Sequence, residues 1–179
     1  DVFTTDVWTW RGLVTYYTVF VIDLASRRVH IVGSTPHPHD VFMRQAARTR
    51  TPADDGLRVG QRVLICDRDA KWSAPVRERL GEAGIRVVQT PCQAPNANAY
   101  AERFVRSIKH ECLNRVIPFG ERHLRRTIAE YVAHYHGERN HQGLENELIE
   151  GAPAVEEHVG RIRRRQRLGG LLNYYCRAA

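Results

Sequence analysis

The first fifth of the chain consists of β-branched and aromatic runs separated by short polar segments. Such runs are typical of β-strands, and short turns between successive strands favour an antiparallel meander. The pattern predicts strands over residues 2–8, 13–23 and 29–33, with the first turn at Arg11 and Gly12.

The middle of the chain alternates apolar runs with helical periodicity. The run at residues 63–66 is typical of a strand buried on both faces, and residues 85–88 predict a second buried strand. Helices are expected over residues 40–48 and 72–84, with a loop over residues 51–60. A strand, a helix and a strand in succession predict parallel pairing beside the antiparallel meander.

The second half of the chain is predominantly helical in pattern. Residues 90–98 predict a mobile loop, followed by helices over residues 99–115 and 122–136. Residues 137–154 read as irregular, and residues 161–175 can form a hairpin around Gly169 and Gly170. We therefore expect an α/β domain over residues 1–150 and a basic C-terminal extension over residues 151–179.

Composition limits the class of protein. A chain of 179 residues, 42% apolar and 26% charged, suits one globular domain. No apolar run reaches the roughly 18 residues that span a bilayer, which argues against a membrane protein or a membrane partner. The four cysteines are scattered without a C-x-x-C pair, which favours a reducing, cytoplasmic setting. Because the chain opens at Asp1 and its only methionine is Met43, we expect it to be a fragment.

The positive charge is concentrated near the C-terminus. The formal net charge is +7, and residues 158–179 contain six arginines and no acid. An almost neutral body with a cationic tail predicts a polyanionic partner, most often nucleic acid, although a solvated tail would have the same composition.

Three acids stand at the ends of predicted elements. Asp1 begins the first strand, Asp67 follows the apolar strand at residues 63–66, and Glu102 lies in the first turn of a helix. Side chains at strand ends converge outside the sheet in α/β proteins, and carboxylate oxygens are the ligands that Mg²⁺ prefers. Three carboxylates from different elements suit a two-metal site for displacement at phosphorus.

Several blocks of sequence resemble one family in the right order. They are DVFTT (residues 1–5), VIDLASRR (21–28), DRDAKW (67–72), PNANAYAERF (95–104) and HYHGERNHQGL (134–144), the last similar to a Y-N-x-x-R-P-H-x-x-L ending. The chain thereby resembles the catalytic core of DDE transposases and retroviral-type integrases, in particular bacterial insertion-sequence transposases. The separation of Asp67 and Glu102 by 34 residues follows the same pattern.

The resemblance implies a fold and an activity. The fold would be ribonuclease-H-like, with a mixed five-stranded sheet of three antiparallel then parallel strands flanked by helices. Asp1, Asp67 and Glu102 would be the catalytic, metal-binding triad for two Mg²⁺ ions, with Mn²⁺ as a substitute. The activity would be cleavage and transfer of DNA strands by a homo-oligomer assembled on DNA in the bacterial cytoplasm.

Other acids compete for these roles. Asp6 competes with Asp1, but five residues along a strand reverse the facing side, so both cannot point into one site. Asp69 competes with Asp67, and a turn or N-cap role before the next helix suits Asp69 equally well. Asp23 is expected to order the turn after the second strand.

Basic side chains surround the predicted triad. The resemblance favours DNA contact for Lys109, while for Arg106 a surface ion pair with Glu102 is equally plausible. Arg103 and the tail residues Arg163, Arg164 and Arg165 are further candidates for phosphate contacts. Three histidines, His134, His136 and His141, lack cysteine partners, so we expect structural or DNA-facing roles instead of a zinc site.

Two alternative functions remain open from the sequence. A ribonuclease-H-type nuclease would use the same fold on an RNA–DNA hybrid. A domesticated relic would bind DNA without cutting it, although retention of all three acids argues against this.

Overall fold

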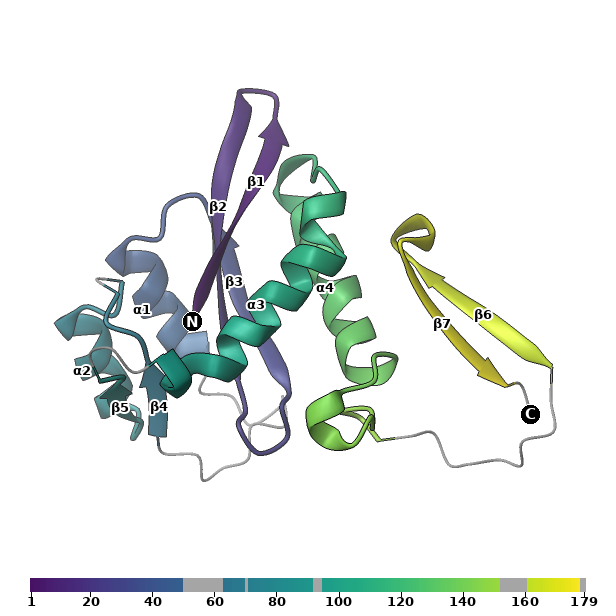
Figure 1. The fold of residues 1–179 in the computed structure, drawn as a ribbon. Coiled ribbons are helices and arrows are strands. Elements are labelled where there is room, and N and C mark those ends of the chain that lie inside the picture. The colour runs from purple at the N-terminus through teal and green to yellow at the C-terminus, as the bar shows by residue number, and fades with distance from the viewer. Residues whose placement is uncertain (50–62, 70, 92–94, 152–160, 178–179) are drawn as a thin grey trace. The chain divides into compact units, whose positions relative to one another are not determined.

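The computed structural model describes residues 1–49, 63–69, 71–91, 95–151 and 161–177 (Figure 1). The strands are β1 (Val2–Thr9), β2 (Gly12–Ile22), β3 (Val29–Thr35), β4 (Val63–Cys66), β5 (Arg86–Gln89), β6 (Ile162–Arg167) and β7 (Leu172–Arg177). The helices are α1 (Asp40–Thr49), α2 (Ala74–Glu82), α3 (Ala99–Glu111) and α4 (Gly120–Gly137). Short 3-10 turns are η1 (Pro95–Asn98), η2 (Leu113–Arg115), η3 (Gln142–Leu144) and η4 (Leu168–Gly170). The predicted order of strands and helices is confirmed, including the terminal hairpin.

The chain divides into two compact units. The first unit comprises Asp1–Thr5, Thr15–Val21 and His30–Arg103, and the second comprises Asp6–Val14, Ile22–Val29 and Phe104–Ala179. The strands β1 and β2 and the helix α3 each contribute residues to both units, which are described separately below.

The first three strands form one sheet in the order β1-β2-β3. Burial alternates along β1, where Phe3, Thr5 and Val7 are buried and Thr4 and Asp6 are exposed. In the turn between β1 and β2, the Thr9 hydroxyl donates to the Gly12 carbonyl at 2.8 Å. Gly12 has a φ of 99°, a left-handed conformation that glycine adopts without the steric cost of a Cβ atom.

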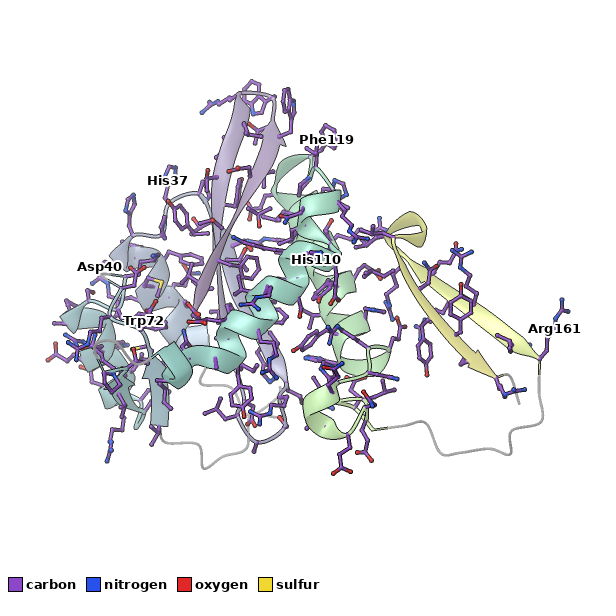
Figure 2. The ribbon with its side chains drawn as sticks, in the orientation of Figure 1. His37, Asp40, Trp72, His110, Phe119 and Arg161 are labelled. Atoms are coloured by element: carbon purple, nitrogen blue, oxygen red, sulfur yellow. The ribbon has the colours of Figure 1, made fainter. Side chains whose placement is uncertain are left out.

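The first unit has its own apolar core. The strands β4 and β5 pair in parallel through the α2 crossover, with Val63 opposite Arg86 and Cys66 opposite Gln89. The core contains six buried side chains: Val19 from β2, Met43 from α1, Cys66 from β4, Trp72 before α2, and Val76 and Leu80 from α2. Trp72, labelled in Figure 2, is a core residue that precedes α2, so the helix begins two residues later than predicted.

The predicted five-stranded sheet differs from the observed pairing. Among the described residues, β1-β2-β3 forms a three-stranded sheet, while β4-β5 and β6-β7 form separate two-stranded sheets. The expectation that β4 is buried on both faces is wrong, because Val63 is 54% and Ile65 42% exposed. Their apolar character reflects strand formation and pairing with β5, whereas Cys66 alone in this strand is fully buried.

The second unit is built around the aromatic face between α3 and α4. Phe104 is fully buried, and its ring centroid lies 6.3 Å from that of Tyr131 and 5.1 Å from that of Tyr135. The apolar side chains at helical spacing in these two segments are all buried: Phe104, Ile108, Cys112, Leu124, Ile128, Tyr131 and Tyr135.

The structure describes three of the four cysteines and allows the helices to be compared with membrane-spanning helices. Cys66, Cys112 and Cys176 are free thiols, and burial raises the pKa of Cys112 to about 11. Cys92 and the middle of the predicted loop at residues 90–98 lie outside the described residues, while its end is the 3-10 turn η1. None of the helices in the described ranges has the length and apolar character needed to cross a membrane.

Replacing Phe104 with alanine is expected to lower the free energy of unfolding by about 3–5 kcal/mol, because the truncated ring leaves a cavity. The control Val41→Ala, on a side chain that is 69% exposed, should change it by less than about 0.5 kcal/mol. Urea unfolding followed by circular dichroism measures both values. Equal effects of the two substitutions would contradict the proposed core.

Candidate functional site

Asp1 is fixed before β1 by hydrogen bonds with three residues of the first unit. One carboxylate oxygen accepts a hydrogen bond from the Val2 amide at 2.6 Å, and the other accepts from the Asn98 side-chain amide at 2.9 Å. The Asp1 amino nitrogen donates to the Phe20 carbonyl of β2 at 2.8 Å. These contacts orient a half-buried carboxylate beside η1, the turn that leads into α3.

Asp67 directly follows β4. Burial raises the pKa of the preceding Cys66 thiol, and the negative charge of Asp67 raises it further. The Asp67 carboxylate is half-buried and accepts a long hydrogen bond of 3.4 Å from the Asp69 amide.

Glu102 lies in the first turn of α3, one helical turn after Asn98. Its side chain is exposed, and its carboxylate has no hydrogen-bond partner within the described ranges. The structure therefore connects the segment of Glu102 to Asp1 through Asn98. It does not gather the predicted triad, because the described residues contain no group of three His, Cys, Asp or Glu side chains able to hold a metal ion.

The competing acids have other roles. Asp6 lies on the exposed face of β1, opposite to the face of Phe3 and Val7, so the choice between Asp1 and Asp6 stays a prediction. Asp69 accepts from the Lys71 amide at 3.0 Å and forms an ion pair with the Lys71 ammonium. Burial alone would raise the pKa of Asp69, but these Lys71 contacts outweigh it and hold the pKa below its usual range. Asp23 accepts from the amides of Ala25 and Ser26 and orders the turn after β2, as expected.

The basic candidates on α3 have differing exposure. Arg103 and Arg106 are exposed, and Lys109 is half-buried. No ion pair joins Arg106 or Lys109 to an acid in the described part of the chain, so the alternative of a surface pair between Glu102 and Arg106 is not observed.

The three histidines are structural. His134 is hydrogen-bonded to Glu138 at 3.0 Å, and the His136 ring accepts from the Val29 amide at 2.9 Å. His141 Nε2 is 2.7 Å from the Tyr135 carbonyl oxygen. Burial lowers the pKa of His141, and the positive charge of Arg139 lowers it further. The hydrogen bond to the Tyr135 carbonyl raises this pKa but does not outweigh the other two effects. All three rings are buried, which confirms the structural role expected for them.

Sequence reasoning missed an ion pair between Glu111 at the end of α3 and Arg139 after α4. Arg139 donates to the Glu111 carboxylate from Nε at 3.1 Å and from Nη2 at 2.8 Å, and the Tyr131 hydroxyl donates at 2.9 Å. Burial raises the pKa of Glu111, but these donors outweigh it and lower the pKa overall. Arg139 lies in the HYHGERNHQGL block, which was the available signal, but its partner lies 28 residues away.

A second missed carboxylate is Glu138, which is 7% exposed. Arg167 of β6 donates to it from Nε at 2.9 Å and from Nη2 at 2.8 Å, and Arg165 Nε lies 3.3 Å away. Burial raises the pKa of Glu138, but hydrogen bonds from Arg167 and His134 outweigh it and lower the pKa. Of the predicted tail residues, all of Arg163, Arg164 and Arg165 are exposed, but Arg165 is also an ion-pair partner of Glu138.

Acid is expected to destabilise the second unit in two stages. The lowered pKa of His141 means that stability is complete above the ordinary value of 6.5 and falls as pH drops below it. The lowered pKa values of Glu111 and Glu138 add a further loss below their ordinary value of 4.5. Urea unfolding at pH 7, 5.5 and 4 should show both losses of stability, and Glu138→Gln should reduce the loss between pH 5.5 and 4. If the exposed control Glu78→Gln reduces that loss equally, Glu138 is not responsible for it.

One family profile matches this chain. Residues 83–147, somewhat more than a third of the chain, match the family described as Integrase core domain. No curated protein matches the chain. An integrase core implies a ribonuclease-H-like α/β fold, and the described residues have a mixed α/β architecture. The matched segment includes Glu102, all of α3 and α4, and the Glu111–Arg139 ion pair. The resemblance found in the sequence is therefore confirmed: residues 83–147 match the integrase core domain family, which supports an integrase or transposase catalytic core.

Proposed function

We propose that this chain catalyses metal-dependent cleavage and joining of DNA strands as the transposase or integrase of a mobile element. The observation that carries the proposal is the hydrogen bond from Asn98 to Asp1, which connects that carboxylate to the start of the Glu102 helix. Asp67 supports it further, because it directly follows the strand β4.

The donor chemistry of Asp1, Asp67 and Glu102 fits Mg²⁺, or Mn²⁺ in its place, because hard divalent cations take oxygen ligands. Two bound ions would stabilise the attacking and the leaving oxygens of an in-line displacement at phosphorus. Asp1 and Asp67 would hold both ions, and Glu102 would complete one coordination sphere. Glu102 is exposed, and its carboxylate has no hydrogen-bond partner in the described part of the chain, so no such contact has to break for it to bind metal.

The attacking group differs between the two steps. Water would attack when a strand is cleaved, and the freed 3′-hydroxyl would attack when that end is joined to target DNA. Neither step needs a covalent enzyme intermediate, so the free thiols have no nucleophilic role. The basic side chains Arg103, Arg106 and Lys109 on α3, with Arg163, Arg164 and Arg165 in the tail, would bind DNA phosphates.

The proposal also covers the domain organisation, the cellular location and the oligomeric state of the protein. Residues 1–150 would be the catalytic core and residues 151–179 a basic extension, a division that stays a prediction because residues 152–160 lie outside the described ranges. The protein would act in the bacterial cytoplasm on DNA, as a homo-oligomer that brings element ends together.

Glu102→Gln should abolish joining of a labelled, pre-nicked DNA end to plasmid in Mg²⁺ or Mn²⁺. We expect a loss of at least about 100-fold, since even the loss of a group supporting a metal ligand costs 10–100-fold. Glu78→Gln, on the exposed side of α2, removes the same charge and should leave joining unchanged. The experiment uses the full-length protein.

The result also separates catalysis from DNA binding alone. A folded protein that binds the DNA end but neither nicks nor joins it with either metal would overturn the proposal. A non-catalytic DNA-binding function would then be favoured, in line with the absence of a three-acid group among the described residues.

Asp1→Asn and Asp6→Asn form a matched pair, with Asp1 before β1 and Asp6 on its exposed face. Asp1→Asn should abolish joining and remove the rise in melting temperature that Mn²⁺ causes in the unsubstituted protein. Asp6→Asn should keep both properties. The reverse result would assign the first acid of the triad to Asp6.

A further inference from the structure

The register of the β6–β7 hairpin separates its side chains into two faces. Directly opposed residues of an antiparallel pair project to the same side, and the side alternates along each strand. One face, called here the anchor face, contains Arg163, Arg165, Arg167, Leu172, Tyr174 and Cys176. The other, called here the outer face, contains Ile162, Arg164, Gln166, Asn173, Tyr175 and Arg177. The arginines of the tail are therefore not equivalent.

The anchor face binds α4 and the residue that follows it. Arg167 donates to Glu138 with two nitrogens and to Glu130 at 2.8 Å, and Arg165 lies 3.3 Å from the same Glu138 carboxylate. Leu172, opposite Arg167, is buried. The hydrogen bonds that Arg167 donates to Glu138 are the largest of the contributions that raise the pKa of Arg167. This face is used for attachment within the second unit.

The outer face combines positive charge with exposed apolar surface. Tyr175 is 60% and Ile162 62% exposed, and Arg164 and Arg177 are also exposed. The Arg164 side chain is oriented by Asn173, whose side-chain oxygen accepts from its Nε at 2.8 Å. No acidic residue occurs anywhere in residues 161–177. The oriented guanidinium group of Arg164, opposite the aromatic ring of Tyr175, complements the phosphates and sugars of a nucleic-acid backbone.

We infer that the outer face of the hairpin is a binding site for the backbone of duplex DNA, contacted by Arg164, Arg177 and Tyr175. The anchor face sets the orientation of this site through the contacts of Arg165 and Arg167 with Glu138. The inference rests on the proposed function and refines it, because it selects Arg164 from the three neighbouring arginines and adds Arg177 and Tyr175.

The test is duplex DNA binding measured by fluorescence anisotropy between 50 and 200 mM salt. The double substitution Arg164→Gln, Arg177→Gln should reduce the slope of log affinity against log salt by about 2, roughly one per lost phosphate contact. The matched control Arg122→Gln, Arg161→Gln removes the same charge from the exposed side of α4 and from the position before β6, and should leave the slope nearly unchanged. Arg161, labelled in Figure 2, precedes β6.

Two further variants separate contact from folding. Tyr175→Ala should weaken binding without changing the salt slope, because it removes no charge. The double substitution Arg164→Lys, Arg177→Lys keeps the charge and should keep most of the salt slope. It provides the test of charge if the glutamine variant is poorly folded. Thermal unfolding by circular dichroism reports folding for each protein.

The outcomes distinguish this inference from the proposed function. Equal losses in the outer-face variant and its control would show diffuse attraction and overturn the outer-face site. An unchanged outer-face variant, in a protein that still binds and joins DNA, would overturn the site and leave the proposed function intact. A folded, unsubstituted protein that does not bind duplex DNA would overturn both.

Discussion

The carboxylate of Glu111 fixes the end of α3 to the end of α4, and the second unit depends on this contact. Arg139 binds both of its oxygens and Tyr131 donates a third hydrogen bond, so a partly buried charge is fully compensated. Losing one partner of such a pair leaves an uncompensated charge, which costs far more than an exposed ion pair contributes. The same contact holds Tyr131 against Phe104, so the ionic and the aromatic parts of the interface support each other.

Glu138, the residue after α4, is a second carboxylate that accepts hydrogen bonds from several donors. These donors are His134 on α4 and Arg167 on the terminal hairpin. The HYHGERNHQGL block is thus largely structural, because His134, His136, Glu138, Arg139 and His141 all make buried or partly buried contacts inside the second unit. Two carboxylates with several donors each thus connect α3 to the residues after α4, and these residues to the hairpin.

The candidate site depends on a different kind of constraint. Asp1 is joined to Asn98 by a hydrogen bond in the first unit, and Asp67 follows the end of β4. Asp69 and Asp23 use the same side-chain chemistry to order turns, and Asp6 lies on the exposed face of β1. Because Asp23 also directly follows a strand, position at the end of an element does not by itself separate the candidate ligands from acids with local roles.

Local sequence determined most of the elements of this protein. Alternation along β1, helical stripes on α3 and α4, and Gly169 and Gly170 in the hairpin turn are set by neighbours within a few residues, so periodicity and turn chemistry identify them. The placement of Asp1, Asp67 and Glu102 at element ends follows from the same local pattern. Tertiary structure alone decided the separate pairing of β4 with β5, the partners Glu111–Arg139 and Glu138–Arg167, and the face on which each tail arginine lies. These features depend on the three-dimensional approach of residues distant in the chain, and on strand register, where a shift of one residue reverses every side chain.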